Sequence, residues 1–284
     1  MSSVSERVAA ARERLRGAGL SAAEADLGAR LLAVHALGWT PAQLLADGRD
    51  AASPDFQRRF EALVARRAAR EPLAYIVGTR EFWGLAFEVT PDVLIPRAET
   101  ELLVEAALDL YPDRHGPLTV ADICTGSGCV AVAMAHERPA WNILAADISD
   151  VALVVARRNA QRHGVADRVH FAQADLLDRI EGPFDLIVAN PPYVRVGDRN
   201  GLQPEVREEP EVALYGGPDG VDTIERFVRQ APSRMKPGAH FVFEFGFGQE
   251  VEVEQIVAAS DALSLVDMRR DLQGIARTAV TRRR

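Results

Sequence analysis

Short apolar runs alternate with segments of helical periodicity from about residue 118 to the end of the sequence. This alternation is typical of strand–helix–strand units, in which parallel strands form a sheet and helices cover both of its faces. The sequence therefore predicts an α/β fold. The expected strands span Leu118–Cys124, Asn142–Asp147, Val169–Ala174, Phe184–Ala189 and His240–Gly246, with two more near Leu263–Met268 and Ala276–Thr281.

The fourth of these strands runs directly into Asn190-Pro-Pro-Tyr193. Ligands of open α/β sheets bind beyond the carboxyl ends of the strands, and the two prolines hold the backbone there in a fixed, extended form. We expect the Asn190 side-chain oxygen and the Pro191 carbonyl to accept both hydrogens of a planar –NH2 group, with the Tyr193 ring stacked against it. This arrangement suits alkylation of an amide or aromatic amine. A simple turn after a strand could contain the same residues.

The first strand leads into a glycine-containing loop, Asp122-Ile-Cys-Thr-Gly-Ser-Gly128, and then into an apolar helix. Gly126 and Gly128 allow the backbone to approach a ligand closely, and the N-terminus of the following helix favours an anionic group. With Ala131, these glycines match a loose dinucleotide-binding pattern, and Asp147 follows at about the 20-residue spacing of a ribose-binding acid. The pattern indicates an adenosine-type cofactor and leaves its identity open.

Two further positions favour S-adenosylmethionine over NAD. Asp175 and Leu176 follow the third strand, where a carboxylate could accept from an adenine amine and an apolar side chain could cover the ring. The second position is Asn190–Tyr193, whose pair of acceptors is aimed at an amine. A hydride-transfer enzyme has no use for such a pair, whereas an N-methyltransferase does. Asp175 could alternatively cap a helix.

Residues 1 to about 78 predict a small helical bundle. Ser21–Glu24 has the pattern of a capping box, Gly38 is placed to end the helix that follows, and Thr40-Pro41 is suited to begin another. Since no side chain in this region suggests catalysis, it is either a partner-recognition module or a packing domain without a binding role.

The hydrophobic period changes toward two around Gly84, which predicts a β-hairpin linker over residues 79–98. A catalytic domain over residues 99–284 is expected to follow. Within it, the long irregular segment Val194–Asp222 is expected to form a lid over the substrate, because loops of this length in compact domains are usually functional or disordered.

Composition excludes several classes of protein. The net charge is −8, and residues 1–80 contain 12 Arg against 9 acidic residues, so the predicted catalytic part is strongly acidic. This charge disfavours bulk attraction to nucleic acid. Cys124 and Cys129 fit neither a zinc pattern nor a disulfide framework, and the histidines have no ligand-like spacing, so no metal is expected. With no membrane span or signal peptide expected, we predict a cytoplasmic protein.

With these residues in place, the sequence resembles the release-factor glutamine methyltransferases, the family called HemK or PrmC, over nearly its whole length. The resemblance rests on Arg80–Gly84, Leu94–Arg97, Glu99–Glu101, Gly126–Gly128 and Asn190–Tyr193, with further matches at Glu209-Pro210, Gly217, Gly220, Arg270–Leu272 and Arg277. The sequence departs from the family at four positions, which the family often fills with Gln, Pro, Gly and an aromatic residue: Ala74, Ala98, Cys124 and Leu176.

The resemblance implies a Rossmann-like class I S-adenosylmethionine-dependent methyltransferase domain and transfer of a methyl group to the glutamine of the Gly-Gly-Gln loop in class-1 peptide chain release factors. It further implies release-factor docking by residues 1–78. We predict in-line displacement without metal or covalent intermediate, and a monomer with no direct nucleic acid or membrane partner. The residues implied to hold the cofactor are Cys124, Thr125, Gly126, Ser127, Gly128, Asp147, Asp175, Leu176 and Asn190. Those implied to hold the glutamine and form the catalytic site are Asn190, Pro191, Pro192 and Tyr193.

Three alternatives stay open. An adenine-N6 methyltransferase acting on nucleic acid would use the same acceptor pair, although the acidic charge and the absence of an obvious base-flipping insert count against it. A glutamine methyltransferase of a ribosomal protein is a second alternative within the family. A non-catalytic cofactor-binding adaptor is the third, and the intact Asn190–Tyr193 segment argues against it.

Overall fold

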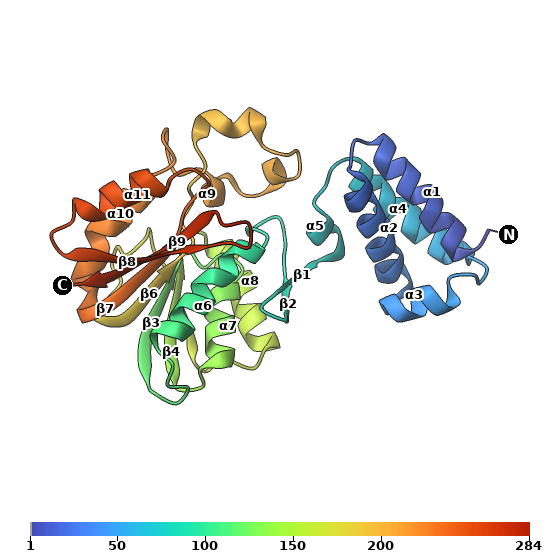
Figure 1. Ribbon diagram of the computed structural model, residues 1–284. Helices are drawn as coiled ribbons and strands as arrows, with labels where there is room; N and C mark the ends of the chain where they lie inside the picture. Colours follow the sequence, from blue (N-terminus) through green and yellow to red (C-terminus); the bar gives the residue numbers. More distant parts are fainter. Residues whose placement is uncertain (1) are drawn as a thin grey trace. The chain divides into compact units, whose positions relative to one another are not determined.

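The structure is a computed structural model that describes residues 2–284 in two compact units (Figure 1). The first unit extends to Gly78 and also includes Gln203–Glu208, while the second comprises Thr79–Leu202 and Glu209–Arg284. Within residues 2–284, no helix combines the length and apolar character that a membrane span requires.

The first unit is helical, and its helix ends form where the sequence predicts them. Ser21 and Glu24 make the reciprocal hydrogen bonds of a capping box, and Gly38 ends the following helix with a φ of 67°. Thr40 caps the next helix. The elements are α1 (Val4–Gly17), α2 (Ala22–Leu37), α3 (Pro41–Asp47), α4 (Pro54–Ala68), α5 (Leu73–Val77) and the 3₁₀ turn η3 (Val206–Glu208).

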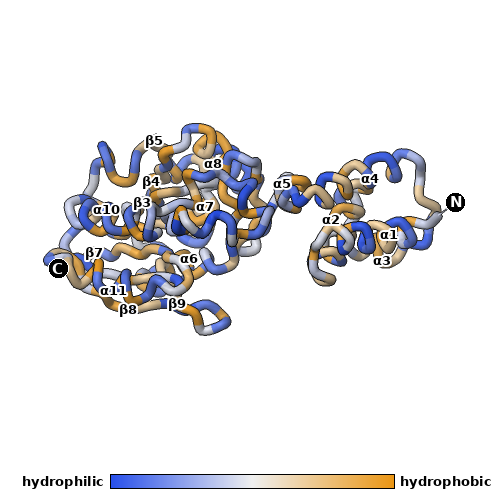
Figure 2. The backbone as a smooth tube through the Cα atoms, turned by 90° about the horizontal axis from the view of Figure 1, so that it is seen from above, coloured by the Kyte–Doolittle hydropathy of each residue, from blue (hydrophilic) through white to orange (hydrophobic). Residues whose placement is uncertain are grey.

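Helices α1, α2 and α4 enclose the core of this unit, which includes Leu15, Leu32 and Phe60. Hydrophobic and hydrophilic residues alternate along these helices in Figure 2, as expected for helices with one buried face. Segment Gln203–Glu208 joins the unit through Glu205, whose carboxylate accepts from Arg67 at 2.8 Å and from Arg70 at 2.7 Å.

The second unit is built on a seven-stranded sheet in the order β5-β4-β3-β6-β7-β9-β8. Strands β3 to β7 are parallel, and β9 lies antiparallel between β7 and β8. This arrangement confirms the predicted α/β fold. Its strands are β3 (Leu118–Ile123), β4 (Trp141–Asp147), β5 (Val169–Gln173), β6 (Phe184–Ala189), β7 (Met235–Glu244), β8 (Leu263–Arg270) and β9 (Ala276–Arg283). Because the chain order reverses between β3 and β6, a ligand crevice is expected at their carboxyl ends.

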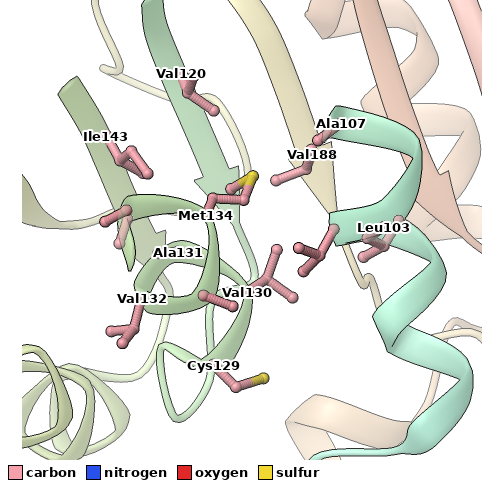
Figure 3. Close-up of a cluster of buried hydrophobic side chains, with 14 of the residues drawn as sticks. Leu103, Ala107, Val120, Cys129, Val130, Ala131, Val132, Met134, Ile143 and Val188 are labelled. Atoms are coloured by element: carbon pink, nitrogen blue, oxygen red, sulfur yellow. The ribbon is translucent and has the colours of Figure 1, made fainter. Parts of the chain in front are cut away.

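Helices cover both faces of this sheet, and a separate core lies on each face. Figure 3 shows the first core, where Leu103 of α6 and Met134 of α7 meet Val120, Ile143 and Val188 of the sheet. The helices of the unit are α6 (Glu101–Leu110), α7 (Cys129–Glu137), α8 (Asp150–Arg162), α9 (Glu211–Leu214), α10 (Asp222–Gln230) and α11 (Glu250–Ala258). Its 3₁₀ turns are η1 (Ala98–Thr100), η2 (Val196–Gly201) and η4 (Ala231–Arg234).

A β-hairpin of β1 (Thr79–Phe82) and β2 (Leu85–Glu88) opens the second unit. Trp83 and Gly84 both have positive φ, which is the two-residue turn that matches the twist of paired strands. Asn159 of α8, which is fully buried, accepts from the Glu88 N–H and donates to the carbonyls of Glu88 and Ser127. The hairpin is thereby linked to the loop that follows β3.

Strand β7 begins at Met235, five residues before the predicted start at His240. The predicted start was wrong because Lys236-Pro-Gly238 has the composition of a turn, whereas the structure accommodates it in an irregular pairing with β6 between Phe184 and Leu186. Proline is tolerated where the regular ladder is interrupted.

Candidate active site

A cavity of about 260 Å³ lies at the carboxyl ends of the parallel strands in the second unit. It is lined by residues that follow β3, β4, β5 and β6, and by segments around η1, α9 and α10. The sequence-predicted residues that line it are Cys124, Thr125, Gly126, Ser127, Asp147, Asp175, Leu176, Asn190 and Pro192. Gly128, Pro191 and Tyr193 lie beside these residues in the chain without forming the wall.

The loop after β3 is held by Asp122, whose side chain is buried at the end of that strand. One carboxylate oxygen accepts from the Thr125 hydroxyl at 2.6 Å and from the Ala131 N–H at 3.1 Å. Burial raises the pKa of Asp122 to about 7, although both hydrogen bonds oppose the rise. The loop therefore depends on a carboxyl group that titrates near neutral pH.

Glycine is required at one position of this loop by packing. Gly128 has a φ of 79°, and a Cβ placed on it would lie 3.0 Å from the Cβ of Ala156 in α8. At Gly126 a Cβ would meet no atom within 4 Å, so the space beside it is available to a ligand. Cys124 has a φ of 61° despite its side chain, which explains why glycine is well suited to that position.

The carboxylate of Asp147 connects the ends of β3 and β4. It accepts from the Gly126 N–H at 2.8 Å and from the Ser149 N–H at 2.9 Å, and burial raises its pKa. Each oxygen has a further lone pair, so the group can still accept from the hydroxyls of a ribose.

Asp175 pairs with Arg226 of α10, a residue that sequence reasoning missed. The Arg226 guanidinium donates to Asp175 at 2.7 Å, and both side chains are partly exposed at the cavity. Within the residues that the structure describes, no helix begins between β5 and β6, so the Asp175 side chain does not act as the helix cap considered from sequence. Leu176 has a φ of 53° and is buried. Nothing in the sequence distinguished Arg226 from the other polar residues of its amphipathic helix.

Asn190 directly follows β6, and its side-chain nitrogen donates to the hydroxyl of Thr100 at 3.1 Å. Thr100 is buried, and its side chain makes no capping hydrogen bond to α6. With its nitrogen engaged, Asn190 has its oxygen free to accept from a ligand in the cavity.

Tyr193 directs its hydroxyl away from the solvent, where it donates to Glu244 of β7 at 2.9 Å. Burial raises the pKa of Tyr193 well above its usual range, and the neighbouring Glu244 carboxylate acts in the same direction. Burial also raises the pKa of Glu244, against the hydrogen bonds from Thr100 and Tyr193.

The segment expected to form a lid supplies part of the cavity wall. Val212 and Tyr215, in and after α9, line the cavity. Glu209, which is buried, accepts from the Ile95 N–H at 2.9 Å and forms an ion pair with Arg97, which also lines the cavity. Burial raises the pKa of Glu209. Closure of this segment over a substrate stays a prediction.

Among residues 2–284, no group of three or more His, Cys, Asp or Glu side chains is placed to hold a metal ion. The donor set at the cavity suits an organic ligand instead: carboxylates at Asp147 and Asp175, an amide at Asn190, and apolar surface at Leu176.

Residues 6–78 match the family described as PrmC N-terminal domain, and residues 99–204 match the family described as Methyltransferase small domain. The release factor glutamine methyltransferase of Cereibacter sphaeroides is 42% identical over 266 residues, which cover 93% of this chain and 93% of that protein. The protein of the same name from Bradyrhizobium diazoefficiens is 40% identical, over 95% of this chain and 91% of its own.

Solved structures share the fold at low identity. The catalytic domain of hMettl16 in complex with MAT2A 3'UTR hairpin 6 aligns with a TM-score of 0.56 and 15% identity, over 77% of this chain and 81% of that one. The ribosomal protein L11 methylase from Lactobacillus delbrueckii subsp. bulgaricus aligns with a TM-score of 0.51 and 24% identity, over 66% and 80%. At these identities the likeness shows the fold alone.

Proposed function

The chain belongs to the family of release factor glutamine methyltransferases, and from that premise we propose that it methylates the side-chain amide nitrogen N5 of the glutamine in the Gly-Gly-Gln loop of class-1 peptide chain release factors. One observation carries the proposal. The side-chain nitrogen of Asn190 donates to Thr100 at 3.1 Å, which leaves the Asn190 oxygen as an acceptor in the cavity. The glycine-containing loop after β3, whose pattern indicates an adenosine-type cofactor, lines the same cavity.

The residues around the cavity fit S-adenosylmethionine. Asp147 would accept from the ribose hydroxyls, Asp175 would accept from the adenine amine, and Leu176 would cover the ring. The backbone of Cys124–Gly128 would approach the methionine part closely. The bound cofactor would supply an electrophilic methyl group for a direct in-line displacement, without a covalent enzyme intermediate.

The protein would contribute positioning and polarisation. An amide nitrogen is a poor nucleophile because its lone pair is delocalised into the carbonyl group. The Asn190 oxygen and the Pro191 carbonyl would accept the two N–H groups of the glutamine, which aims the nitrogen and increases its electron density. Pro191 and Pro192 would keep these acceptors rigid, and the Tyr193 ring would pack against the amide plane. The proton would leave late, since the amide becomes acidic as the N–C bond forms.

We further propose that the first unit docks the release factor. An exposed groove of about 600 Å³ runs along α1, α2 and α3, where Leu27 and Leu45 are 49% and 90% exposed. Leu27 belongs to the apolar stripe of α2. Its exposure to solvent therefore indicates a surface that binds a partner. The substitutions Leu27→Ser and Leu45→Ser should raise KM for the intact release factor and leave KM for a short Gly-Gly-Gln peptide unchanged. Equal KM values for the intact factor would contradict docking here.

The proposed reaction is tested by methyl transfer from labelled S-adenosylmethionine to purified release factor. The parallel substrates are the Gly-Gly-Ala version of the factor, a glutamine-containing ribosomal protein and plain DNA. We expect label in the intact factor alone, and we expect Asn190→Ala to reduce turnover far more than cofactor affinity. Label in DNA or in the ribosomal protein would assign the site to one of those substrates. Cofactor binding without any transfer would indicate an adaptor.

A further inference from the structure

The side-chain amide of Gln249 joins three parts of the backbone beside the cavity. Gln249 directly precedes α11 and is 3% exposed. Its Oε1 accepts from the Gly246 N–H at 2.7 Å, just after the end of β7. Its Nε2 donates to the carbonyl of Tyr193 at 3.0 Å and to that of Gly220 at 3.3 Å. One buried side chain therefore links Asn190–Tyr193 to the end of β7 and to the end of the segment expected to form a lid.

The three partners of Gln249 allow only one orientation of its amide. A backbone carbonyl accepts and a backbone N–H donates, so the side-chain nitrogen must face the two carbonyls and the oxygen must face Gly246. Because the side chain is buried, removing it would leave these backbone groups without their partner.

The Asn190–Tyr193 segment depends on such a contact because its two prolines have no N–H to donate. Before the segment, Ala189 is held in the sheet by pairing with Phe243 of β7. After the prolines, the Tyr193 carbonyl is held by Gln249. Gln249 therefore anchors the segment at the end that lies farther along the chain from the sheet.

Gly220 packs closely against this anchor. It has a φ of 75°, and a Cβ placed on it would lie 2.5 Å from the Tyr193 carbonyl oxygen and 2.8 Å from the Gln249 Nε2. The chain after Tyr193 is joined to the same region through Val194. The Val194 N–H donates to the last carbonyl of α9 at 2.8 Å, and the Val194 carbonyl accepts from the Gly216 N–H at 3.0 Å.

We propose that Gln249 is a positioning residue that holds Asn190–Tyr193 in place for the glutamine of the substrate. The proposal rests on the role of that segment in the proposed function. Gln249 does not line the cavity, so it acts through the Tyr193 backbone and not by contact with a ligand. By fixing the Tyr193 carbonyl, it limits movement of the Pro191 carbonyl, the second acceptor for the substrate amide.

The substitution Gln249→Met removes all three hydrogen bonds with little change in side-chain length. In the absence of substrate, the backbone N–H groups of Val194 and Gly216 should exchange with solvent hydrogen several-fold faster, as measured by nuclear magnetic resonance. We expect kcat per mole of bound S-adenosylmethionine to fall on the order of 10- to 100-fold, since a small misplacement of reacting groups has effects of this size. The Kd of S-adenosylmethionine should stay within about threefold, and counting bound cofactor excludes unfolded molecules.

The substitution Gln249→Glu separates the two sides of the amide, and it remains the test if Gln249→Met does not fold. The introduced carboxyl group keeps an oxygen for the Gly246 N–H, but it cannot donate to the carbonyls of both Tyr193 and Gly220. We expect the Gly246 N–H to stay protected while that of Val194 exchanges faster, together with a fall in kcat per bound cofactor.

Thr281→Val is the matched control. Thr281 is fully buried, and its hydroxyl donates to the Phe241 carbonyl of β7 at 2.8 Å. Neither residue lines the cavity. The control therefore removes another buried hydrogen bond to the backbone, and exchange at Val194 and Gly216 and kcat per bound cofactor should match those of the wild type.

Unchanged exchange at Val194 and Gly216 in the Gln249 variants would overturn the proposal. Faster exchange with an unchanged kcat per bound cofactor would also overturn it, as would a fall in cofactor affinity equal to the fall in kcat. If the wild type does not methylate the release factor, the proposed function fails instead, and the exchange rates still decide whether Gln249 holds Tyr193.

Discussion

The carboxylate of Asp147 accepts a hydrogen bond from the backbone N–H of Gly126 at 2.8 Å. The bond joins the end of β4 to the loop that follows β3, whose last residue Ile123 pairs with Ala146. The same carboxylate accepts from the Ser149 N–H at 2.9 Å. One partly buried acid therefore shapes both the loop after β3 and the start of α8.

Asp147→Asn should weaken binding of S-adenosylmethionine by about 10- to 100-fold, because one acceptor oxygen is replaced by a donor and charge-assisted hydrogen bonds contribute about 1.5–3 kcal/mol. Isothermal titration calorimetry measures the change directly. Asp150→Asn is the control, since Asp150 is exposed at the start of α8 and does not line the cavity. Equal affinities for both variants would contradict the ribose-binding role of Asp147.

The two glycines of the loop should respond differently to alanine. Gly128→Ala should lower the free energy of unfolding by about 2–4 kcal/mol, because the new Cβ would be strained at positive φ and would crowd Ala156 at 3.0 Å. Gly126→Ala should cost only about 1 kcal/mol, since its Cβ enters open space.

Cofactor affinity should show the reverse order when it is corrected for the folded fraction. The Cβ of Gly126→Ala would project into the space available to the ligand, so this variant should lose more affinity than Gly128→Ala does. Chemical denaturation gives the stabilities and calorimetry gives the affinities. Similar losses of affinity in the two variants would argue against a close approach of the ligand at Gly126.

Patterns local in sequence predicted most of the fold. The strand–helix alternation indicated the parallel sheet, and the capping box at Ser21 and the terminator Gly38 marked the ends of α2. These signals depend on neighbouring residues, so they can be read without knowing the packing. The strands expected beyond β7 were also found, and their antiparallel direction emerged only from the structure.

The candidate site was less accessible to sequence reasoning, because its supporting contacts join distant residues. The bond between Thr100 and Asn190 spans 90 positions, and that between Asp175 and Arg226 spans 51. The surroundings of Glu244 likewise form only when β7 pairs beside β6, so no local pattern indicates them. Which side chains meet across a sheet edge depends on strand order, and strand order is not written in any local pattern.

Asp175→Asn should reduce affinity for S-adenosylmethionine on the order of 10-fold, because the amide nitrogen cannot accept from the adenine amine. The same substitution should not change affinity for an analogue that lacks this amine. Competition binding against the wild type measures both. Asp178→Asn is the control, since Asp178 is exposed and bonds to Gln230 outside the cavity wall. An equal loss of affinity for S-adenosylmethionine and for the analogue would contradict a contact between Asp175 and the adenine amine.

Asp122 should make the stability of the protein depend on pH between about 4 and 7. Burial raises the pKa of this carboxyl from 3.8 to about 7 in the folded chain. Well below pH 3.8 the group is protonated in both the folded and the unfolded chain. As the pH rises toward 7, the unfolded chain releases the proton and the folded chain keeps it, so the free energy of unfolding falls, by at most about 4 kcal/mol. Above pH 7 both forms are ionised and the decline stops.

Asp122→Asn removes this titration, so its free energy of unfolding should depend less on pH than that of the wild type between pH 4 and 7. Urea denaturation at a series of pH values gives the two curves, and their difference isolates Asp122 from other buried acids such as Glu209 and Glu244. Only the slopes are compared, because the substitution also changes the hydrogen bonds to Thr125 and Ala131. Parallel curves would mean that Asp122 is ionised in the folded chain throughout this range, and that the loop after β3 is held by a charge at every pH tested.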